Sequence, residues 1–204
     1  MLLGLTLAAC SSTPVPDWQM NAKGSSERAT EAWLSGDSRI EAAEFARARA
    51  EVARTARPDL LARLELLRCA TRVAALELEA CNGFDALAAD AAPAEQAYAR
   101  YLAGNAQAAD AALLPSAHRS LVSAGQTDVS AIEDPLARLV AAGVLLRRGA
   151  ATPATVQAAV DTASARGWRR PLLAWLKVQQ QRAQAAGAAD EAARLQRRID
   201  LMLR

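Results

Sequence analysis

Signals that start and stop α-helices recur along this sequence and divide it into segments of helical length. Proline is favoured in the first turn of a helix, where its missing N–H would have no partner, and glycine is favoured just after the last turn. The prolines at predicted helix starts are Pro58, Pro135, Pro153 and Pro171, and the glycines at predicted stops are Gly149, Gly167 and Gly187. We therefore expect consecutive helices joined by short turns.

The residue composition argues against a β-fold. The chain has 204 residues, including 52 Ala and 27 Leu but only 10 Val and 3 Ile. Ala and Leu are strong helix formers, whereas β-branched residues favour strands, so a sandwich, a barrel or a parallel sheet is not expected. The predicted fold class is all-α, with antiparallel helical hairpins that form an irregular solenoid or a bundle. We assign residues 25–204 to a single helical domain.

Apolar spacing and capping residues place the individual helices. Ser38 and Glu41 have the spacing of a capping box, which predicts a helix over about residues 39–56. Apolar stripes predict further helices that begin at the prolines named above, and a last one over residues 188–203. Residues 84–124 are less regular and are expected to hold three or four shorter helices, broken near Pro93, Gly104 and Pro115.

Three segments resemble the inter-helix turn of tetratricopeptide-type hairpins, in which Gly or Asp turns the chain and small residues let two helices approach. They are centred on Gly36, Gly104 and, more weakly, Gly187, and each is followed by paired alanines. The first interval is 68 residues, a multiple of the 34-residue repeat, but the second is 83. We expect a body similar to that class without a regular repeat. An unrelated Ala-rich helical bundle is the alternative.

The N-terminus resembles the signal and lipobox of bacterial lipoproteins. Residues 1–9 are apolar apart from Thr6 and run into Leu7-Ala8-Ala9-Cys10. The resemblance implies that Cys10 carries a diacylglycerol thioether, that the chain is cleaved before it and that the new amino terminus is acylated. No Lys or Arg precedes this short apolar run, so the signal peptide at residues 1–9 is interpreted as truncated at its start, with a start codon placed too far downstream. The alternative is an apolar tail with a chance cysteine.

Residues 10–24 are assigned to a lipidated, flexible tether, because they contain Pro14, Pro16 and Gly24 but no apolar periodicity. The preceding apolar run is too short for a membrane-spanning helix, which needs about 20 residues. Several acyl chains on Cys10 would form a durable membrane anchor instead. Ser11 and Ser12 resemble the residues that send such lipoproteins to the outer membrane, so we expect the protein there, on the periplasmic face.

The two other cysteines, Cys69 and Cys81, form a candidate disulfide, since export implies an oxidising compartment. Within one continuous helix they would lie about 18 Å apart, beyond disulfide reach. A helix that ends near Ala75 would let the chain return, and the alternating residues 76–79 followed by Asn82-Gly83 are typical of extended chain and a turn. The alternative is one buried thiol at Cys69 and one free thiol near a helix end.

Charge is nearly balanced overall, at +2, but is unevenly distributed. Residues 73–135 contain nine acidic and two basic side chains, whereas residues 166–204 contain nine basic and three acidic ones. Such asymmetry can steer charged partners. The simpler interpretation is that these are solvated helix faces that attract each other within the fold. Because export argues against nucleic acid, lipid headgroups, lipopolysaccharide phosphates or an acidic protein patch are the expected partners of the basic end.

The sequence contains no recognisable catalytic or metal-binding constellation. It has no Gly-x-Ser-x-Gly elbow, and its one histidine, His118, is expected to be a satisfied surface or helix-end residue. Glu77 and Glu79 are a carboxylate pair of the kind a glycan-cleaving enzyme uses, but they do not resemble the catalytic Glu-Ser motif of lytic transglycosylases. One histidine and two cysteines do not complete a tetrahedral metal site, and we expect no metal and no cofactor.

These observations predict a non-enzymatic helical adaptor, held at the outer membrane by lipid on Cys10 and bound to an envelope protein or a cell-wall component. The expected binding face is the groove between successive hairpins, and the oligomeric state is left open. The alternatives are a murein-modifying enzyme with an unrecognised carboxylate and a purely structural envelope lipoprotein. A cleft with a buried, unpaired carboxylate of raised pKa would favour the enzyme, and a concave surface without one would favour the adaptor.

Overall fold

The computed structural model describes residues 14–203, and over that range the protein is helical and contains no strand. The predicted all-α class is therefore confirmed. The predicted signal peptide at residues 1–9 and the lipidation site Cys10 lie outside the described residues. The elements are α1 (Asp17–Ser35), α2 (Ser38–Ala53), α3 (Pro58–Ala74), α4 (Asn82–Asp85), η1 (Ala88–Asp90), α5 (Pro93–Leu102), η2 (Ala108–Leu113), α6 (Ser116–Ser123), α7 (Pro135–Arg147), α8 (Pro153–Arg166), α9 (Arg169–Ala185) and α10 (Ala189–Leu203).

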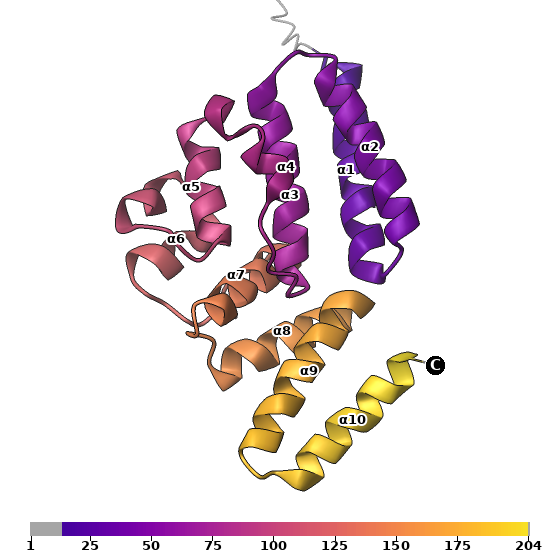
Figure 1. Ribbon diagram of the computed structural model, residues 1–204, viewed down its shortest axis with the longest axis vertical. Coiled ribbons are helices and arrows are strands. Elements are labelled where there is room, and N and C mark those ends of the chain that lie inside the picture. The colour runs from indigo at the N-terminus through magenta and orange to yellow at the C-terminus, as the bar shows by residue number, and fades with distance from the viewer. Residues whose placement is uncertain (1–13, 204) are drawn as a thin grey trace, which may run out of the picture.

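Helix α3 occupies the middle of the molecule (Figure 1). The antiparallel α1/α2 hairpin lies on one side of it, and α5 and α6 lie on the other. Helix α7 packs against α3, and α8, α9 and α10 follow, each packed against the helix before it. The α9/α10 hairpin therefore forms the end of the molecule that is farthest from the start of α1.

The main core lies where α3, α7, α8 and α9 meet. Trp175 of α9 is fully buried, and its Nε1–H donates to the carbonyl oxygen of Ala74 at 3.1 Å. Gly143 of α7 lies directly against α3, where a Cβ would overlap the carbonyl oxygen of Val73 and stand 2.9 Å from its Cγ1. The close approach of α7 to α3 thus depends on the missing side chain at Gly143.

Several helices begin and end where the sequence predicts. Pro58, Pro135 and Pro153 are the first residues of α3, α7 and α8. Gly167 ends α8 in the left-handed conformation, with φ 67°. Helix α9 begins at Arg169, however, so Pro171 is its third residue rather than its first. Proline is tolerated there because no N–H in the first turn has an intrahelical partner.

The predicted capping box at Ser38 and Glu41 is wrong. The residue that caps α2 is Asp37, whose Oδ1 accepts the Ile40 N–H at 2.9 Å. Glu41 instead turns inward to α3, where it accepts hydrogen bonds from Arg68 and other basic side chains. An aspartate caps as well as a serine, and the arginines of α3 draw the glutamate away from the backbone.

The predicted flexible tether over residues 10–24 is also wrong for its second part, since residues 17–24 form the first turns of α1. Pro16 precedes the helix, and Asp17 lies in its first turn, where a negative charge is favoured by the helix dipole. Ala22 is buried in the core that α1 shares with α2 and α3. Tertiary packing therefore extends the helix through Gly24, and the helical body begins at Asp17 rather than at residue 25.

The central region contains the predicted short elements, α4, η1, α5, η2 and α6, with Pro93 starting α5 and Pro115 preceding α6. Of the three predicted hairpin turns, those at Gly36 and Gly187 join the antiparallel pairs α1/α2 and α9/α10. The turn at Gly104 leads from α5 into a 3-10 helix instead. The spacing of the turn glycines therefore does not correspond to three equivalent hairpins.

Candidate functional site

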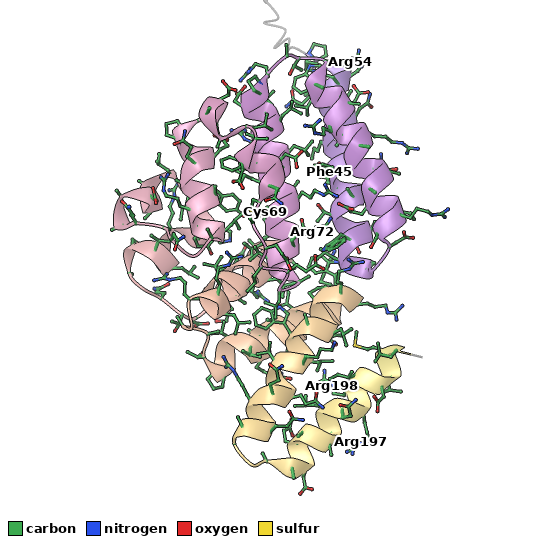
Figure 2. The ribbon with its side chains drawn as sticks, viewed as in Figure 1. Phe45, Arg54, Cys69, Arg72, Arg197 and Arg198 are labelled. Atoms are coloured by element: carbon green, nitrogen blue, oxygen red, sulfur yellow. A yellow bond between two sulfur atoms is a disulfide. The ribbon has the colours of Figure 1, made fainter. Side chains whose placement is uncertain are left out.

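The α1/α2 hairpin meets α3 through a layer of arginines and carboxylates centred on Glu41, which is only 4% exposed. Arg68 Nε and Arg72 Nη2 of α3 donate to its carboxylate at 2.9 and 3.0 Å. A second link joins Arg49 of α2 to Glu65 of α3 at 3.1 Å. Figure 2 shows Arg72 between α3 and the hairpin. Because charge-assisted hydrogen bonds are directional, these pairs fix how the hairpin sits on α3.

Trp33, near the end of α1, joins this layer to the C-terminal half of the molecule. The guanidinium carbons of Arg72 and Arg170 lie 3.0 and 3.5 Å from the centroid of its ring. Arg170, from α9, also donates to the carbonyl oxygen of Gly36 at 3.2 Å and to Ser38 Oγ at 2.8 Å. Helices α1, α3 and α9 are thus held together by one aromatic ring between cations.

Cys69 and Cys81 form a disulfide, with their Cα atoms 5.6 Å apart. Helix α3 ends at Ala74, and Leu76 adopts a positive φ of 62°, which turns the chain back along the helix. This is the chain return that the alternating residues 76–79 indicate. The disulfide therefore fastens the connection between α3 and α5 against the side of α3.

A charged groove of about 290 Å³ lies beside the disulfide. Its lining residues are Glu65, Arg68, Cys69, Arg72, Glu77, Glu79, Ala80, Cys81, Asn82 and Gly83. Burial raises the pKa of Glu77, and the positive charges of Arg72 and Arg170 oppose the rise. Glu77 is nevertheless 41% exposed at its side chain and lies 3.9 Å from Arg170. A strongly perturbed catalytic acid would be fully buried and unpaired, and Glu77 is neither.

An apolar groove of about 410 Å³ lies between α3 and α5. Its lining residues are Arg63, Leu66, Leu67, Ala94, Glu95, Tyr98, Leu113, Leu114 and Pro115. At its edge Arg63 Nη2 donates to Glu95 Oε1 at 2.6 Å, and Leu113 is 44% exposed. Leucine walls with one ion pair at the rim suit an apolar side chain or a short amphipathic segment.

His118 is buried at 2% exposure, so the predicted surface position is wrong, but it lies at a helix end, as the third residue of α6. Its ring stacks on Tyr101, with centroids 4.8 Å apart, and its Nε2 lies 3.1 Å from the carbonyl oxygen of Ala137. Burial lowers the pKa of His118. The histidine thus packs α6 against α5 and α7, and neither groove includes it.

The residues that organise this region, Trp33, Arg72 and Arg170, are not among the predicted site residues. A signal was present, because Arg68 and Arg72 are four residues apart and so share one face of α3 with apolar neighbours. Two arginines on an otherwise buried face require acidic or aromatic partners. The partners come from α1, α2 and α9, which are distant in the sequence.

Among residues 14–203, no group of three or more His, Cys, Asp or Glu side chains is arranged to hold a metal ion. None of the helices in that range combines the length and the apolar character needed to cross a bilayer. Comparisons with protein-family models, with characterised proteins and with solved structures find no match to the chain.

Proposed function

We propose that this protein is a lipid-anchored adaptor of the bacterial envelope, which binds an apolar segment of another envelope component in the groove between α3 and α5. The anchor rests on the lipobox resemblance at Cys10, which lies outside the described residues. A tether from membrane to adaptor raises the local concentration of a partner without any new contact.

The apolar groove is the observation that carries the proposal. It is built from elements on both sides of the disulfide-fastened connection, and the Arg63–Glu95 pair joins its two main walls, α3 and α5. Leu66, Leu67 and Leu114 supply apolar surface, and the Arg63–Glu95 pair supplies an edge that can orient a partner. A purely structural role predicts no concave groove, and the two grooves weigh against it.

The test places a photo-crosslinking amino acid at Leu113, on the rim of the groove, in cells that make the protein. The matched control carries the same group at Ile40, which is equally exposed but lies on α2. We expect a discrete envelope adduct from position 113, none from position 40, and loss of the adduct in Leu67→Glu. The same adduct from both positions, or none from either, would contradict the proposed binding site.

A murein-modifying enzyme is the second candidate, and the charged groove is what favours it. Glu77 and Glu79 both line that groove, and the pKa of Glu77 is raised by burial. The test is the release of soluble fragments from purified cell-wall sacculi by the wild type, Glu77→Gln and Glu79→Gln. Fragment release that Glu77→Gln abolishes would replace the adaptor proposal with this one.

A further inference from the structure

The acidic and basic parts of the chain do not neutralise each other inside the fold. Between residues 73–135 and 166–203, the described side chains make one ion pair, Arg170 with Glu77, at 3.9 Å. Direct ion pairing between the two parts is therefore limited to this contact, whereas the predicted solvated faces are present. Glu95 and Asp110 are buried and paired with Arg63 and Arg100, but exposed charges of both signs remain at the surface.

Several unpaired acidic groups lie on the connection between α3 and α5. Glu79, Asp85 and Asp90 are exposed and form no ion pair within the described residues, and we call them the acidic strip. No Lys or Arg occurs between Arg72 and Arg100, so no basic neighbour in the sequence offsets them. Glu79 also lines the charged groove, so the surface beside it is hollowed.

Two unpaired basic groups lie on α10. Arg197, Arg198 and Leu201 share one side of this helix by their spacing, and we call them the basic strip. Both arginines are exposed and make no ion pair within residues 14–203, and Leu201 is 68% exposed. Figure 2 shows the two arginines on the outermost helix of the C-terminal end, whereas Leu195 and Ile199 are buried toward α9.

We propose that the basic strip of one molecule docks on the acidic strip of a second copy of this chain, in a head-to-tail contact. The two strips belong to different parts of one molecule, because α10 packs on α9 whereas the connection packs on α3 (Figure 1). A second copy supplies an oppositely charged partner to both strips at once. Such a contact uses two different surfaces, so it can repeat from molecule to molecule.

The position of α10 argues for a second copy over a lipid surface. Helix α10 lies at the end of the molecule opposite the start of α1 (Figure 1). A bilayer reached through the N-terminus would therefore lie away from the basic strip. Exposed ion pairs are weak and are screened by salt, so we expect weak association in solution.

The experiment is sedimentation velocity of the full chain carrying Cys10→Ala, at about 20 mM and about 0.5 M salt. Two charge-reversed forms are compared with it, Arg197→Glu/Arg198→Glu and Glu79→Arg/Asp85→Arg. The control, Arg39→Glu/Lys177→Glu, makes the same change in net charge as Arg197→Glu/Arg198→Glu, at exposed positions outside both strips. Circular dichroism checks that each form is folded.

We expect the parent and the control to associate at low salt and to dissociate at high salt. Each charge-reversed form alone should be monomeric, and an equimolar mixture of the two should associate, because each then offers the other a complementary surface. A monomeric parent at low salt, association that neither reversal weakens, or a mixture that stays monomeric would overturn the proposal. Binding of the parent to anionic vesicles, lost in Arg197→Glu/Arg198→Glu and without self-association, would assign the basic strip to lipid instead.

Discussion

Helix α3 is held on its two sides by different kinds of contact. Toward α7 and α9 the contact is apolar and close, with Gly143 against Val73 and the buried ring of Trp175 against the end of the helix. Toward the α1/α2 hairpin it includes Glu41, Arg68 and other charged groups. Apolar contacts stabilise in proportion to buried area, whereas hydrogen-bonded charges require particular positions.

The difference teaches how an Ala-rich chain can fix the position of its helices. Alanine faces have little relief, so many helix arrangements bury similar areas. On the α7 side, the missing side chain at Gly143 selects one register by allowing the closest approach. On the hairpin side, the carboxylate of Glu41 selects one helix register by accepting hydrogen bonds from two arginines, Arg68 and Arg72.

The largest effect should come from Gly143→Ala, which breaks the close apolar contact. The added methyl group would overlap the Val73 carbonyl oxygen, and a backbone atom cannot rotate away. We expect a loss of about 3 kcal/mol in the free energy of unfolding, measured by urea denaturation. The control is Gly24→Ala, where the Cβ would meet only the flexible end of Arg28 and stability should stay level or rise. Equal effects at both positions would refute the role of the contact.

Removal of the disulfide should have the next largest effect. In Cys69→Ser/Cys81→Ser, the unfolded chain is freed from a cross-link that spans 12 residues. The expected loss is about 2–3 kcal/mol in the free energy of unfolding, and treatment of the wild type with a reductant should reproduce it. Unchanged stability after reduction would mean that packing alone holds the connection on α3.

Glu41→Gln tests the polar side of α3. The variant keeps the shape of the side chain but leaves Arg68 and Arg72 without their shared negative partner, at a cost of about 2 kcal/mol by urea denaturation. Glu51→Gln removes the pair with Arg54 at the surface and should change stability little. A loss for Glu41→Gln no larger than for Glu51→Gln would show that the polar layer does not position the hairpin.

The smallest effect concerns His118, the one histidine of the chain. Burial lowers its pKa below the ordinary 6.5, so the unfolded state takes up a proton at higher pH than the folded state does. Stability should therefore fall as the pH drops below about 6.5, by at most about 1.4 kcal/mol per pH unit, and His118→Gln should remove this slope.

The raised pKa of Glu77 acts in the opposite direction. The Glu77 carboxylate takes up a proton at higher pH in the folded state than in the unfolded state. Protonated Glu77 therefore stabilises the fold at low pH, and this stabilisation is lost as the pH rises through the folded pKa. Glu77→Gln removes that contribution. The stability of His118→Gln is therefore compared with that of its parent in chains that both carry Glu77→Gln. A slope that persists without His118 would assign the pH dependence to other groups.

Local signals in the sequence predict much of the fold. Pro58, Pro135 and Pro153 mark helix starts correctly because first-turn capping depends on neighbouring residues alone. The prediction of a flexible tether is wrong at residues 17–24, where packing against α2 decides the structure. The surface position predicted for His118 is wrong for the same kind of reason, since two tyrosines of α5 cover it.

The candidate site is less predictable than the fold. The disulfide follows from a helix that ends near Ala75, a local feature. The grooves and the contacts of Trp33 with Arg72 and Arg170 depend on which helices meet, and α9 is more than a hundred residues from α1 in the sequence. Charge counts by segment indicate where partners are needed but not whether the fold itself supplies them.

The most direct test of the proposed function is the intact mass of the protein extracted from membranes of a Gram-negative host, beside Cys10→Ala. The proposal predicts a chain that starts at Cys10, carries added acyl groups and is membrane-bound, and it predicts that Cys10→Ala loses both the added mass and the membrane association. An unmodified chain that is found in the soluble fraction in both cases would contradict the lipid-anchored adaptor.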